Sequence, residues 1–195
     1  IIMIKDILKN IPDKLEYKET TSLKFKSDLI DVFEDIGNDY TVLELGTNHG
    51  HTTRVLSYIF NEVITMDWKE EPNLRIAREI SADRDNITYI EKNVYEEEWG
   101  VNNFDVVLID CCHTTECVVS DIKNSIKYGS DQIYLIFDDY GHPKTGVKSA
   151  IQMMENEING FERVAYIGES SGNYLLSYGQ DALVDWEGVI YKYEN

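Results

Sequence analysis

Acidic side chains follow two mostly apolar segments of the chain, at the point where each segment ends. Residues 104–109 run into Asp110, and residues 132–137 run into Asp138 and Asp139. Both segments have the length and composition of buried strands, and the carboxyl ends of parallel strands meet at one edge of a sheet. We therefore expect the three carboxylates to converge, where unpaired like charges would be costly. A hard divalent cation, with Mg2+ the first choice, would relieve the repulsion because it prefers carboxylate oxygens.

An imidazole lies three residues after the first of these carboxylates. His113 could take a proton from a hydroxyl group, and a metal would lower the pKa of that hydroxyl beforehand. His113 and Asp110 are the predicted catalytic residues. A histidine at the start of a helix can equally bond to the backbone or to Asp121, so both interpretations of His113 stay open. His142, beside the aspartate pair, is a lesser candidate for the same role.

The loop after the first predicted strand, residues 43–53, reads Leu-Glu-Leu-Gly-Thr-Asn-His-Gly-His-Thr-Thr. A dinucleotide fingerprint beginning at Gly46 would need glycine at positions 48 and 51, which are asparagine and histidine. A P-loop would need lysine after the second glycine, where this chain has histidine. The loop instead fits Glu-x-Gly-x-x-x-Gly, in which glycines let the backbone approach a small ligand and Glu44 receives a cation or an ammonium group. This pattern disfavours a pyrophosphate ligand.

An acidic residue also follows the second predicted strand, residues 62–66. Asp67 lies 21 residues after Gly46, which matches the ~20-residue offset at which a carboxylate accepts both ribose hydroxyls of a nucleoside ligand. Asp67 is therefore the ribose candidate. The offset suits any nucleoside cofactor and does not separate one such cofactor from another.

Residues 43–53 resemble motif I of class I S-adenosylmethionine-dependent methyltransferases, especially small-molecule O-methyltransferases of the catechol type. The resemblance implies S-adenosyl-L-methionine as the cofactor, which carries ammonium, sulfonium and carboxylate groups but no phosphate. Thr52, opening the next helix, could hold the cofactor carboxylate together with the helix N-terminus. The implied cofactor-binding residues are Glu44, Gly46, Thr47, Asn48, Gly50, Thr52, Asp67, Trp68, Asn93 and Asp110.

A longer resemblance covers residues 40 to about 158. The Asp110-x-x-His113 segment, Asp121, residues 138–140 and residues 146–150 are similar to a methyltransferase group that includes macrocin-type sugar O-methyltransferases and cephalosporin hydroxylase-like proteins. Several members bind a divalent metal through strand-end carboxylates. The metal ligands implied here are Asp110, Asp138 and Asp139.

The chain departs from that group at two neighbouring positions. Cys111 stands where glycine is common, and Cys112 stands where the sugar methyltransferases often carry another acid, which puts a family general base in doubt. A zinc site formed by these thiols with Cys117 and His113 is disfavoured, because a structural zinc pair is normally separated by two to four residues. Small buried thiols at a strand-to-helix junction are the better interpretation.

Short apolar runs alternate with amphipathic segments from residue 40 onward. Strands are predicted at 40–45, 62–66, 86–91, 104–109 and 132–137, and helices at 3–9, 22–36, 51–60, 72–81, 114–127 and 145–156. After these, 161–167 and 173–178 are expected to pair as an antiparallel edge hairpin, and 185–193 is ambiguous with strand favoured. With the resemblance, this order predicts an α/β fold: a doubly wound, seven-strand, Rossmann-like methyltransferase sheet, mostly parallel. We expect one domain over 1–195, with N-terminal helices in 1–36 and the α/β core in 37–195.

Composition limits the partners of this chain. Its 195 residues include 18 basic and 36 acidic side chains, a net charge of -18. Without a Lys/Arg block, a nucleic-acid backbone or an anionic lipid surface is disfavoured as a partner. No apolar run approaches the ~20 residues of a membrane span, and no signal peptide is evident. We expect a cytoplasmic protein with a small-molecule substrate, in which a homodimer could supply a substrate lid.

The function expected from the sequence is methyl transfer from S-adenosylmethionine to a hydroxyl oxygen of a sugar-like or other small molecule, assisted by a divalent cation. Two alternatives stay open. The departures at Cys111 and Cys112 and a short N-terminal region motivate a non-catalytic or degenerate cofactor-binding domain. An NAD-dependent oxidoreductase is the second alternative, and the residues at positions 48 and 51 disfavour it.

Overall fold

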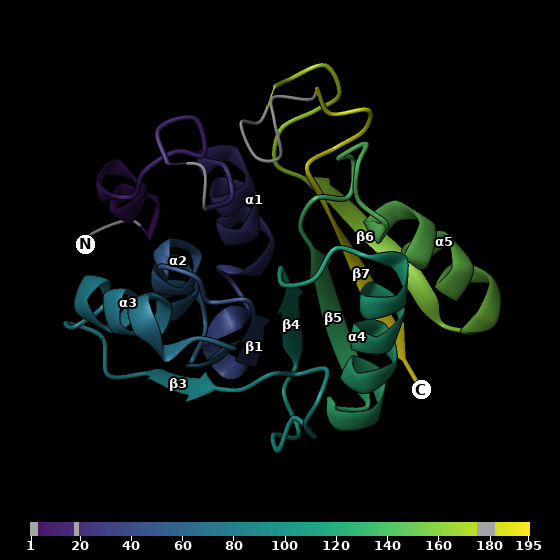
Figure 1. The fold of residues 1–195 in the computed structure, drawn as a ribbon, viewed down its shortest axis with the longest axis horizontal. Helices are drawn as coiled ribbons and strands as arrows, with labels where there is room; N and C mark the ends of the chain where they lie inside the picture. The colour runs from purple at the N-terminus through teal and green to yellow at the C-terminus, as the bar shows by residue number, and fades with distance from the viewer. Residues whose placement is uncertain (1–3, 18–19, 175–181) are drawn as a thin grey trace.

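A seven-stranded sheet forms the centre of the computed structural model, which describes residues 4–17, 20–174 and 182–195 (Figure 1). The strand order is β3-β2-β1-β4-β5-β7-β6, in which β7 alone runs antiparallel to its neighbours β5 and β6. The order reverses between β1 and β4, and the carboxyl ends at such a switch point form the usual ligand crevice. The strands are β1 Thr41–Leu45, β2 Glu62–Asp67, β3 Ile87–Glu91, β4 Val106–Ile109, β5 Gln132–Phe137, β6 Phe161–Ile167 and β7 Gly188–Glu194.

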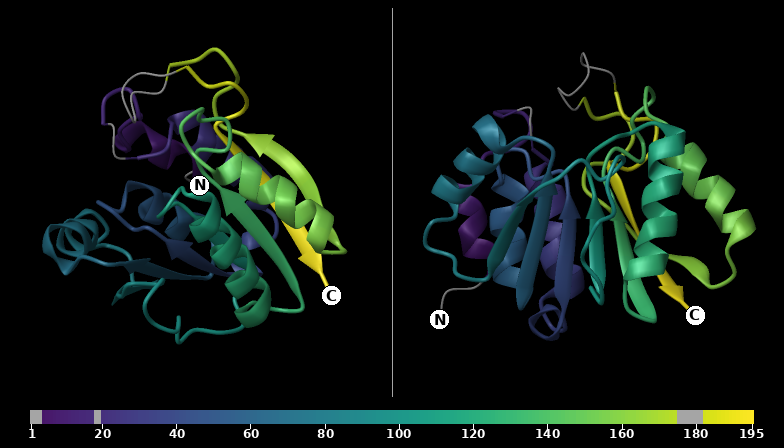
Figure 2. Two further views of the ribbon diagram at one scale, coloured as in Figure 1. Left: turned by 45° about the vertical axis from the view of Figure 1, so that its right-hand side comes forward. Right: turned by 60° about the horizontal axis from the view of Figure 1, so that its bottom comes forward.

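Helices cover both faces of the sheet (Figure 2). Side chains alternate along each strand, so Val106 and Leu108 of β4 face one core while Val107 and Ile109 face the other. The first core contains α1 and α2, and the second contains α4 and α5. The helical segments are η1 Ile4–Asn10, α1 Leu23–Phe33, η2 Gly37–Asp39, α2 His51–Ile59, η3 Glu70–Leu74, α3 Arg75–Ile80, α4 Thr115–Tyr128 and α5 Val147–Glu157. Among the described residues, no helix has the length and apolar character needed to cross a membrane.

The predicted α/β class and the mostly parallel, doubly wound sheet with an antiparallel edge are confirmed. The predicted partner of residues 161–167 was wrong. β6 pairs with β7, whose buried Val189, Ile190 and Tyr191 insert the strand between β5 and β6. In the segment predicted to pair there, Tyr174 forms only an isolated bridge with Ala182, and residues 175–178 lie outside the described residues. The C-terminal segment, which the sequence left ambiguous, is strand β7, because its apolar run suits a buried position between β5 and β6.

Candidate functional site

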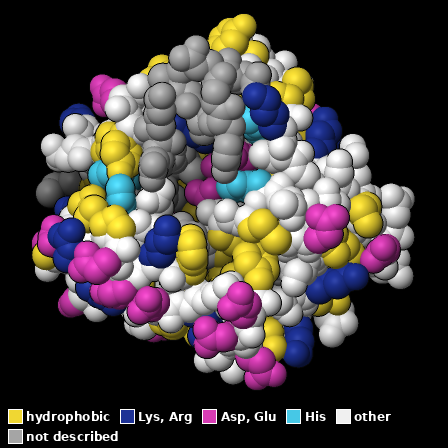
Figure 3. Space-filling model, viewed as in Figure 1, with side chains coloured by type: hydrophobic (Ala, Val, Ile, Leu, Met, Phe, Trp, Pro, Cys, Tyr) yellow, Lys and Arg dark blue, Asp and Glu magenta, His cyan; other side chains and the backbone are white. Residues whose placement is uncertain are grey.

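A cavity of about 770 Å³ lies at the carboxyl ends of β1, β2, β4 and β5. Its volume falls in the range of roughly 300–1,000 Å³ that is usual for small-molecule sites. Figure 3 shows acidic and histidine side chains gathered in a hollow near the centre of this face. The predicted site residues that line the cavity are Gly46, Thr47, Asn48, Thr52, Asp67, Trp68, Asn93, Asp110, His113, Asp138 and Asp139. Glu44 and Gly50 do not line it.

The carboxylate of Asp67 is held in one orientation at the end of β2. Its Oδ2 atom accepts a hydrogen bond from the backbone N–H of Asn48 at 2.8 Å, and its Oδ1 atom accepts from the backbone N–H of Lys69 at 3.1 Å and from Asn73 Nδ2 at 3.2 Å. Asp67 thus connects the loop after β1 to the loop after β2. Because each carboxylate oxygen can accept more than one hydrogen bond, Asp67 can also accept from a ligand in the cavity.

Glu44 points away from the cavity, into the interior beside α2. Its side chain is 1% exposed, and its Oε2 atom accepts hydrogen bonds from the hydroxyls of Thr53 and Thr65, both at 2.5 Å. Burial raises the pKa of Glu44 to about 8, against the opposing effect of the two threonines. A buried, protonated carboxyl group does not match the prediction that Glu44 receives the ammonium group of the cofactor. The mismatch arises because successive side chains of β1 face opposite sides of the sheet.

The two glycines of the loop after β1 lie at points where its backbone closely approaches other parts of the chain. Gly46 has a φ of +99°, and a Cβ atom there would lie 2.0 Å from the backbone oxygen of Asp110. Gly50 has a φ of +77°, and a Cβ atom there would lie 2.6 Å from the Cβ atom of Ala77 in α3. Gly46 therefore lets the loop after β1 pass the loop after β4, while Gly50 lets α2 begin against α3.

We expect Gly46→Ala to lower the free energy of unfolding by about 3 kcal/mol or more, because it combines a strained φ with an overlap against immobile backbone. Gly172→Ala is the matched control. Gly172 also has a positive φ, +91°, but a Cβ atom there would meet no atom within 4 Å among the described residues. Urea denaturation should show a loss of only about 1 kcal/mol for the control. Equal losses in the two variants would contradict the close approach at Gly46.

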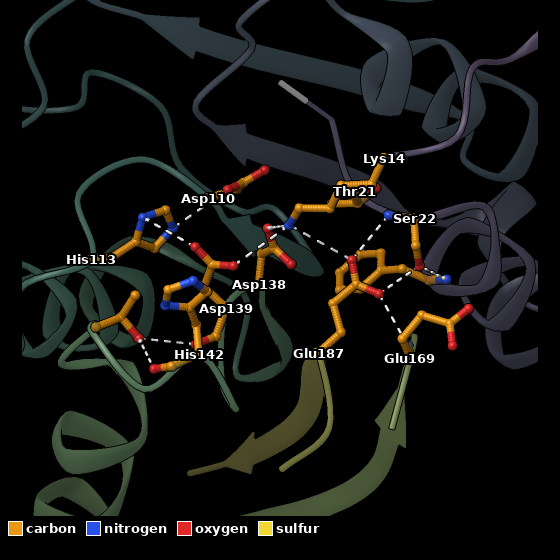
Figure 4. A network of polar contacts seen from close by, with 12 residues as sticks. Lys14, Thr21, Ser22, Asp110, His113, Asp138, Asp139, His142, Glu169 and Glu187 are labelled. Carbon is orange, nitrogen blue, oxygen red and sulfur yellow. Dashed lines mark hydrogen bonds and ion pairs between the residues drawn. The ribbon is translucent and has the colours of Figure 1, made fainter. Parts of the chain in front are cut away.

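Four ionisable side chains that follow β4 and β5 meet at the end of the cavity opposite Asp67 (Figure 4). They are those of Asp110, His113, Asp138 and Asp139. His113 Nε2 lies 3.4 Å from Asp110 Oδ1, and His113 Nδ1 lies 3.7 Å from Asp139 Oδ2. Asp138 and Asp139 are 3% and 2% exposed, and the Oδ1 atom of each is buried without a hydrogen bond from the described residues. Asp139 also has a left-handed φ of 55°, a strained conformation of the kind that clusters at functional sites.

The carboxylates change the protonation of His113. Burial opposes a charged imidazole, but the close contact with Asp110 and the charges of Asp139 and Asp138 outweigh it and raise the pKa of His113 to about 9. Burial and the charge of Asp138 likewise raise the pKa of Asp110 to about 7. A pKa raised in this direction favours the protonated form of His113 at neutral pH. His113 is placed to donate hydrogen bonds, whereas the predicted role as a general base needs the neutral ring.

A lysine from the N-terminal segment lies among these carboxylates. Lys14 Nζ is 3.5 Å from Asp139 Oδ1, 3.6 Å from Asp138 Oδ2 and 3.8 Å from Glu187 Oε1, and the residue is 3% exposed. Burial disfavours a charged amine, but the three carboxylates outweigh this effect and raise the pKa of Lys14 above its usual range. Sequence reasoning missed both Lys14 and Glu187, because neither belongs to a recognisable motif.

This ammonium group bears directly on the predicted metal. Three carboxylates with exposed lone pairs would suit Mg2+, but a tethered cation already lies beside Asp138 and Asp139. Across residues 4–17, 20–174 and 182–195, no group of three or more His, Cys, Asp and Glu side chains is arranged to hold a metal ion. The residues as arranged here do not fit the divalent cation that the sequence predicts.

The segment that carries Lys14 is held against the sheet by its neighbours. Asp13 Oδ1 accepts a hydrogen bond from the backbone N–H of Leu23, in the first turn of α1, at 3.4 Å. Glu187, just before β7, accepts from the backbone N–H of Ser22 at 2.9 Å and from its hydroxyl at 2.5 Å. These bonds connect the start of α1 to the edge of the sheet and keep Lys14 over the cavity.

The cysteines at the junction after β4 are free thiols. Cys111 lines the cavity, and its Sγ atom lies 2.8 Å from the hydroxyl of Tyr95, which donates a hydrogen bond to Asp121 Oδ2 at 2.8 Å. Asp121 is fully buried, and burial raises its pKa to about 7. Asp121 therefore supports Tyr95 and the wall of the cavity, and it does not bond to His113 as one interpretation of the sequence suggested.

Comparisons with known proteins agree with this geometry. A sequence model described as a methyltransferase domain matches residues 43–140, just over half of the chain. No curated protein sequence matches the chain significantly.

Solved structures share the whole fold. An O-methyltransferase from Bacillus cereus in complex with SAH (S-adenosylhomocysteine) has 16% identity and a TM-score of 0.66, over 98% of this chain and 89% of that chain. An N-methyltransferase from Bradyrhizobium japonicum has 14% identity and a TM-score of 0.63, over 87% and 93%. A precorrin-6y C5,15-methyltransferase from Geobacter metallireducens has 11% identity and a TM-score of 0.66, over 95% and 96%. The chain therefore belongs to the methyltransferase domain family and has the fold of class I S-adenosylmethionine-dependent methyltransferases.

Proposed function

We propose that this chain transfers the methyl group of S-adenosylmethionine to a hydroxyl oxygen of a small molecule. One observation carries the proposal: a single cavity joins Gly46 and Asp67 at one end to a buried set of acidic and basic side chains at the other. The first end suits a nucleoside cofactor, and the second suits a polar acceptor that must be held and deprotonated.

At the cofactor end, the residues have the right chemistry for S-adenosylmethionine. Asp67 presents a fixed acceptor for a ribose hydroxyl, and a second hydroxyl would compete with the 3.2 Å contact from Asn73. Thr47, Asn48 and Asn93 add hydroxyl and amide groups. Two lysines also line this end, but Lys92 Nζ donates hydrogen bonds to the carbonyl oxygens of Glu98 and Trp99, and Lys69 Nζ lies over the ring of Trp68. When bound, the cofactor supplies a sulfonium methyl group that is already electrophilic.

At the acceptor end, the chain's own groups bind and orient the second reactant. His113 is placed to donate a hydrogen bond to the acceptor, and the buried Asp138–Asp139 pair is placed to accept one from its hydroxyl group. When the hydroxyl oxygen bonds to the methyl group, the bond from that methyl group to sulfur breaks, and a carboxylate of the aspartate pair takes the hydroxyl proton. Holding two reactants in line accounts for much of the rate in a reaction of this type. The divalent cation expected from the sequence is not part of this proposal, because Lys14 lies beside two of its predicted ligands.

A small molecule is the proposed acceptor because the net charge of -18 opposes binding to a nucleic-acid backbone. The cytoplasmic location and the homodimer stay predictions.

The proposal is tested by titrating the protein with S-adenosylhomocysteine, NAD and ATP and following thermal unfolding. A ligand at ~100 times its dissociation constant adds ~2.7 kcal/mol of stability, which for a chain of this size raises Tm by roughly 5 to 10 °C. We expect this shift with S-adenosylhomocysteine and none with NAD or ATP. A shift with NAD alone would support an oxidoreductase, and no shift with any of the three would support a relic or scaffold domain that binds no cofactor.

A further inference from the structure

The cation in the acceptor half of the cavity belongs to the chain itself. Figure 4 shows the Lys14 side chain reaching from the N-terminal segment to the carboxylates of Asp138, Asp139 and Glu187. All three carboxylates are almost fully buried, as is Lys14. Such a group of acids needs a compensating positive charge, because buried like charges repel strongly. Lys14 supplies that charge from a position that a mobile ion would otherwise need.

The ammonium group of Lys14 and the carboxylates of Asp138 and Asp139 can still form hydrogen bonds with a ligand. The distances from Lys14 Nζ, 3.5 to 3.8 Å, are those of ion pairs and exceed the 2.7–3.2 Å of an N–H···O hydrogen bond. In the part of the chain that the structure describes, the contacts of Lys14 Nζ with the carboxylates are these ion pairs, and Asp138 Oδ1 and Asp139 Oδ1 accept no hydrogen bond. Lys14, Asp138 and Asp139 all line the same cavity. Buried acceptors without partners are costly, so the two carboxylate oxygens point to a ligand that donates to them beside the ammonium group.

A hydroxyl group fits this pairing, since it donates one hydrogen bond and accepts others. A carboxylate oxygen of the aspartate pair would receive its proton in a hydrogen bond, and the ammonium group would donate to its oxygen. A divalent cation would have to lie ~2.0–2.1 Å from several carboxylate oxygens. It would then share a small buried space with the ammonium group, and the two positive charges would repel each other.

We propose that Lys14 takes the place of a divalent cation in the acceptor half of the cavity and binds the acceptor hydroxyl together with Asp138 and Asp139. The part of the inference that concerns the acceptor hydroxyl rests on the proposed methyltransferase function. The part that concerns the binding of a divalent cation does not. Two consequences follow. The native chain should not bind a divalent cation at these carboxylates, and removing Lys14 should create a site that does.

The test is a calorimetric titration of the native protein and of Lys14→Ala with Mn2+ alone. We expect no saturable binding to the native protein, and one Mn2+ per chain in Lys14→Ala, at least roughly tenfold tighter than any binding to the native protein. Adding Asp138→Asn to Lys14→Ala should abolish the gain. Lys148→Ala is the matched control, because Lys148 makes an ion pair with Asp185 at 2.6 Å but does not line the cavity. It should bind no Mn2+.

Two results would overturn the proposal: saturable Mn2+ binding to the native protein that Asp138→Asn removes, or no Mn2+ binding to a folded Lys14→Ala. If circular dichroism shows that Lys14→Ala is unfolded, Lys14→Met keeps the length of the side chain without its charge and replaces it in the same titration. The Mn2+ titration of the native protein needs no Lys14 variant to test whether the native carboxylates bind a divalent cation. A parallel titration of the native protein with S-adenosylhomocysteine separates the two proposals, since its failure would remove the proposed function and leave the Mn2+ results standing.

Discussion

Replacing Asp67 with asparagine is expected to weaken the binding of S-adenosylhomocysteine by roughly 100-fold, or about 2.7 kcal/mol. A hydrogen bond to a charged group is worth about 1.5 to 3 kcal/mol, and the variant removes the charge from the proposed ribose contact. An amide at this position has one oxygen instead of two. It must serve either the backbone N–H of Asn48 or the ligand, and its NH2 group then faces a donor.

Isothermal titration calorimetry of Asp67→Asn against the native protein measures this loss. Glu91→Gln is the matched control, because Glu91 is the register partner of Asp67 at the end of the neighbouring strand β3 but is exposed and does not line the cavity. The control removes the same charge at the same edge of the sheet and should leave the affinity within about twofold. An Asp67→Asn variant that is folded and binds as tightly as the control would refute the ribose assignment.

The strand-end positions could be predicted because they follow from periodicity and topology alone. Apolar runs separated by amphipathic segments dictate a parallel sheet, and a parallel sheet brings Asp67, Asp110 and Asp138 to one edge. The structure brings these side chains to one cavity as that reasoning requires. For Gly46 the sequence predicted a backbone approach to a ligand, and the structure adds a close approach to the backbone oxygen of Asp110, which no local pattern showed.

Other features depend on contacts that no local pattern encodes. Lys14 reaches the site through tertiary packing over a sequence distance of more than 100 residues. Glu44 matches a ligand-binding motif, but the alternation of side chains along β1 turns it toward Thr53 and Thr65. The pairing of β6 with β7 depends on which apolar segment fits between β5 and β6. The segment 173–178 is closer to β6 in the sequence, and for that reason the sequence wrongly favoured it.

The buried carboxyl group of Glu44 leads to the second large effect, which is a change of stability with pH. Below pH 4.5, its ordinary pKa, Glu44 is protonated in both the folded and the unfolded chain. Between pH 4.5 and about 8 the unfolded chain releases this proton while the folded chain keeps it, so stability falls as the pH rises. At ~1.4 kcal/mol per pH unit, the loss at pH 7 relative to pH 4 is about 3 kcal/mol.

Glu44→Gln should be free of this loss, because glutamine does not ionise and its amide oxygen can accept the hydrogen bonds from Thr53 and Thr65. Urea unfolding of the variant and the native protein between pH 4 and 8 isolates the contribution of this residue, since all other titrating groups are shared. The variant should gain about 3 kcal/mol on the native protein between pH 4 and pH 7. Glu62→Gln, at an exposed position on the adjacent strand β2, should show no such gain.

The same variant decides between two roles for Glu44. If the residue is a structural group behind the loop, since it is buried and does not line the cavity, Glu44→Gln should bind S-adenosylhomocysteine within about twofold of the native affinity. If Glu44 instead receives the ammonium group of the cofactor, the loss of its charge should weaken binding by at least roughly tenfold, because a charged hydrogen bond would disappear. Stability curves that stay parallel from pH 4 to 8 together with weakened binding would restore the role predicted from the motif. A pH-dependent gain in stability with unchanged binding would assign the cofactor's ammonium group to other residues of the cavity, such as Asp110, whose backbone oxygen lies beside Gly46.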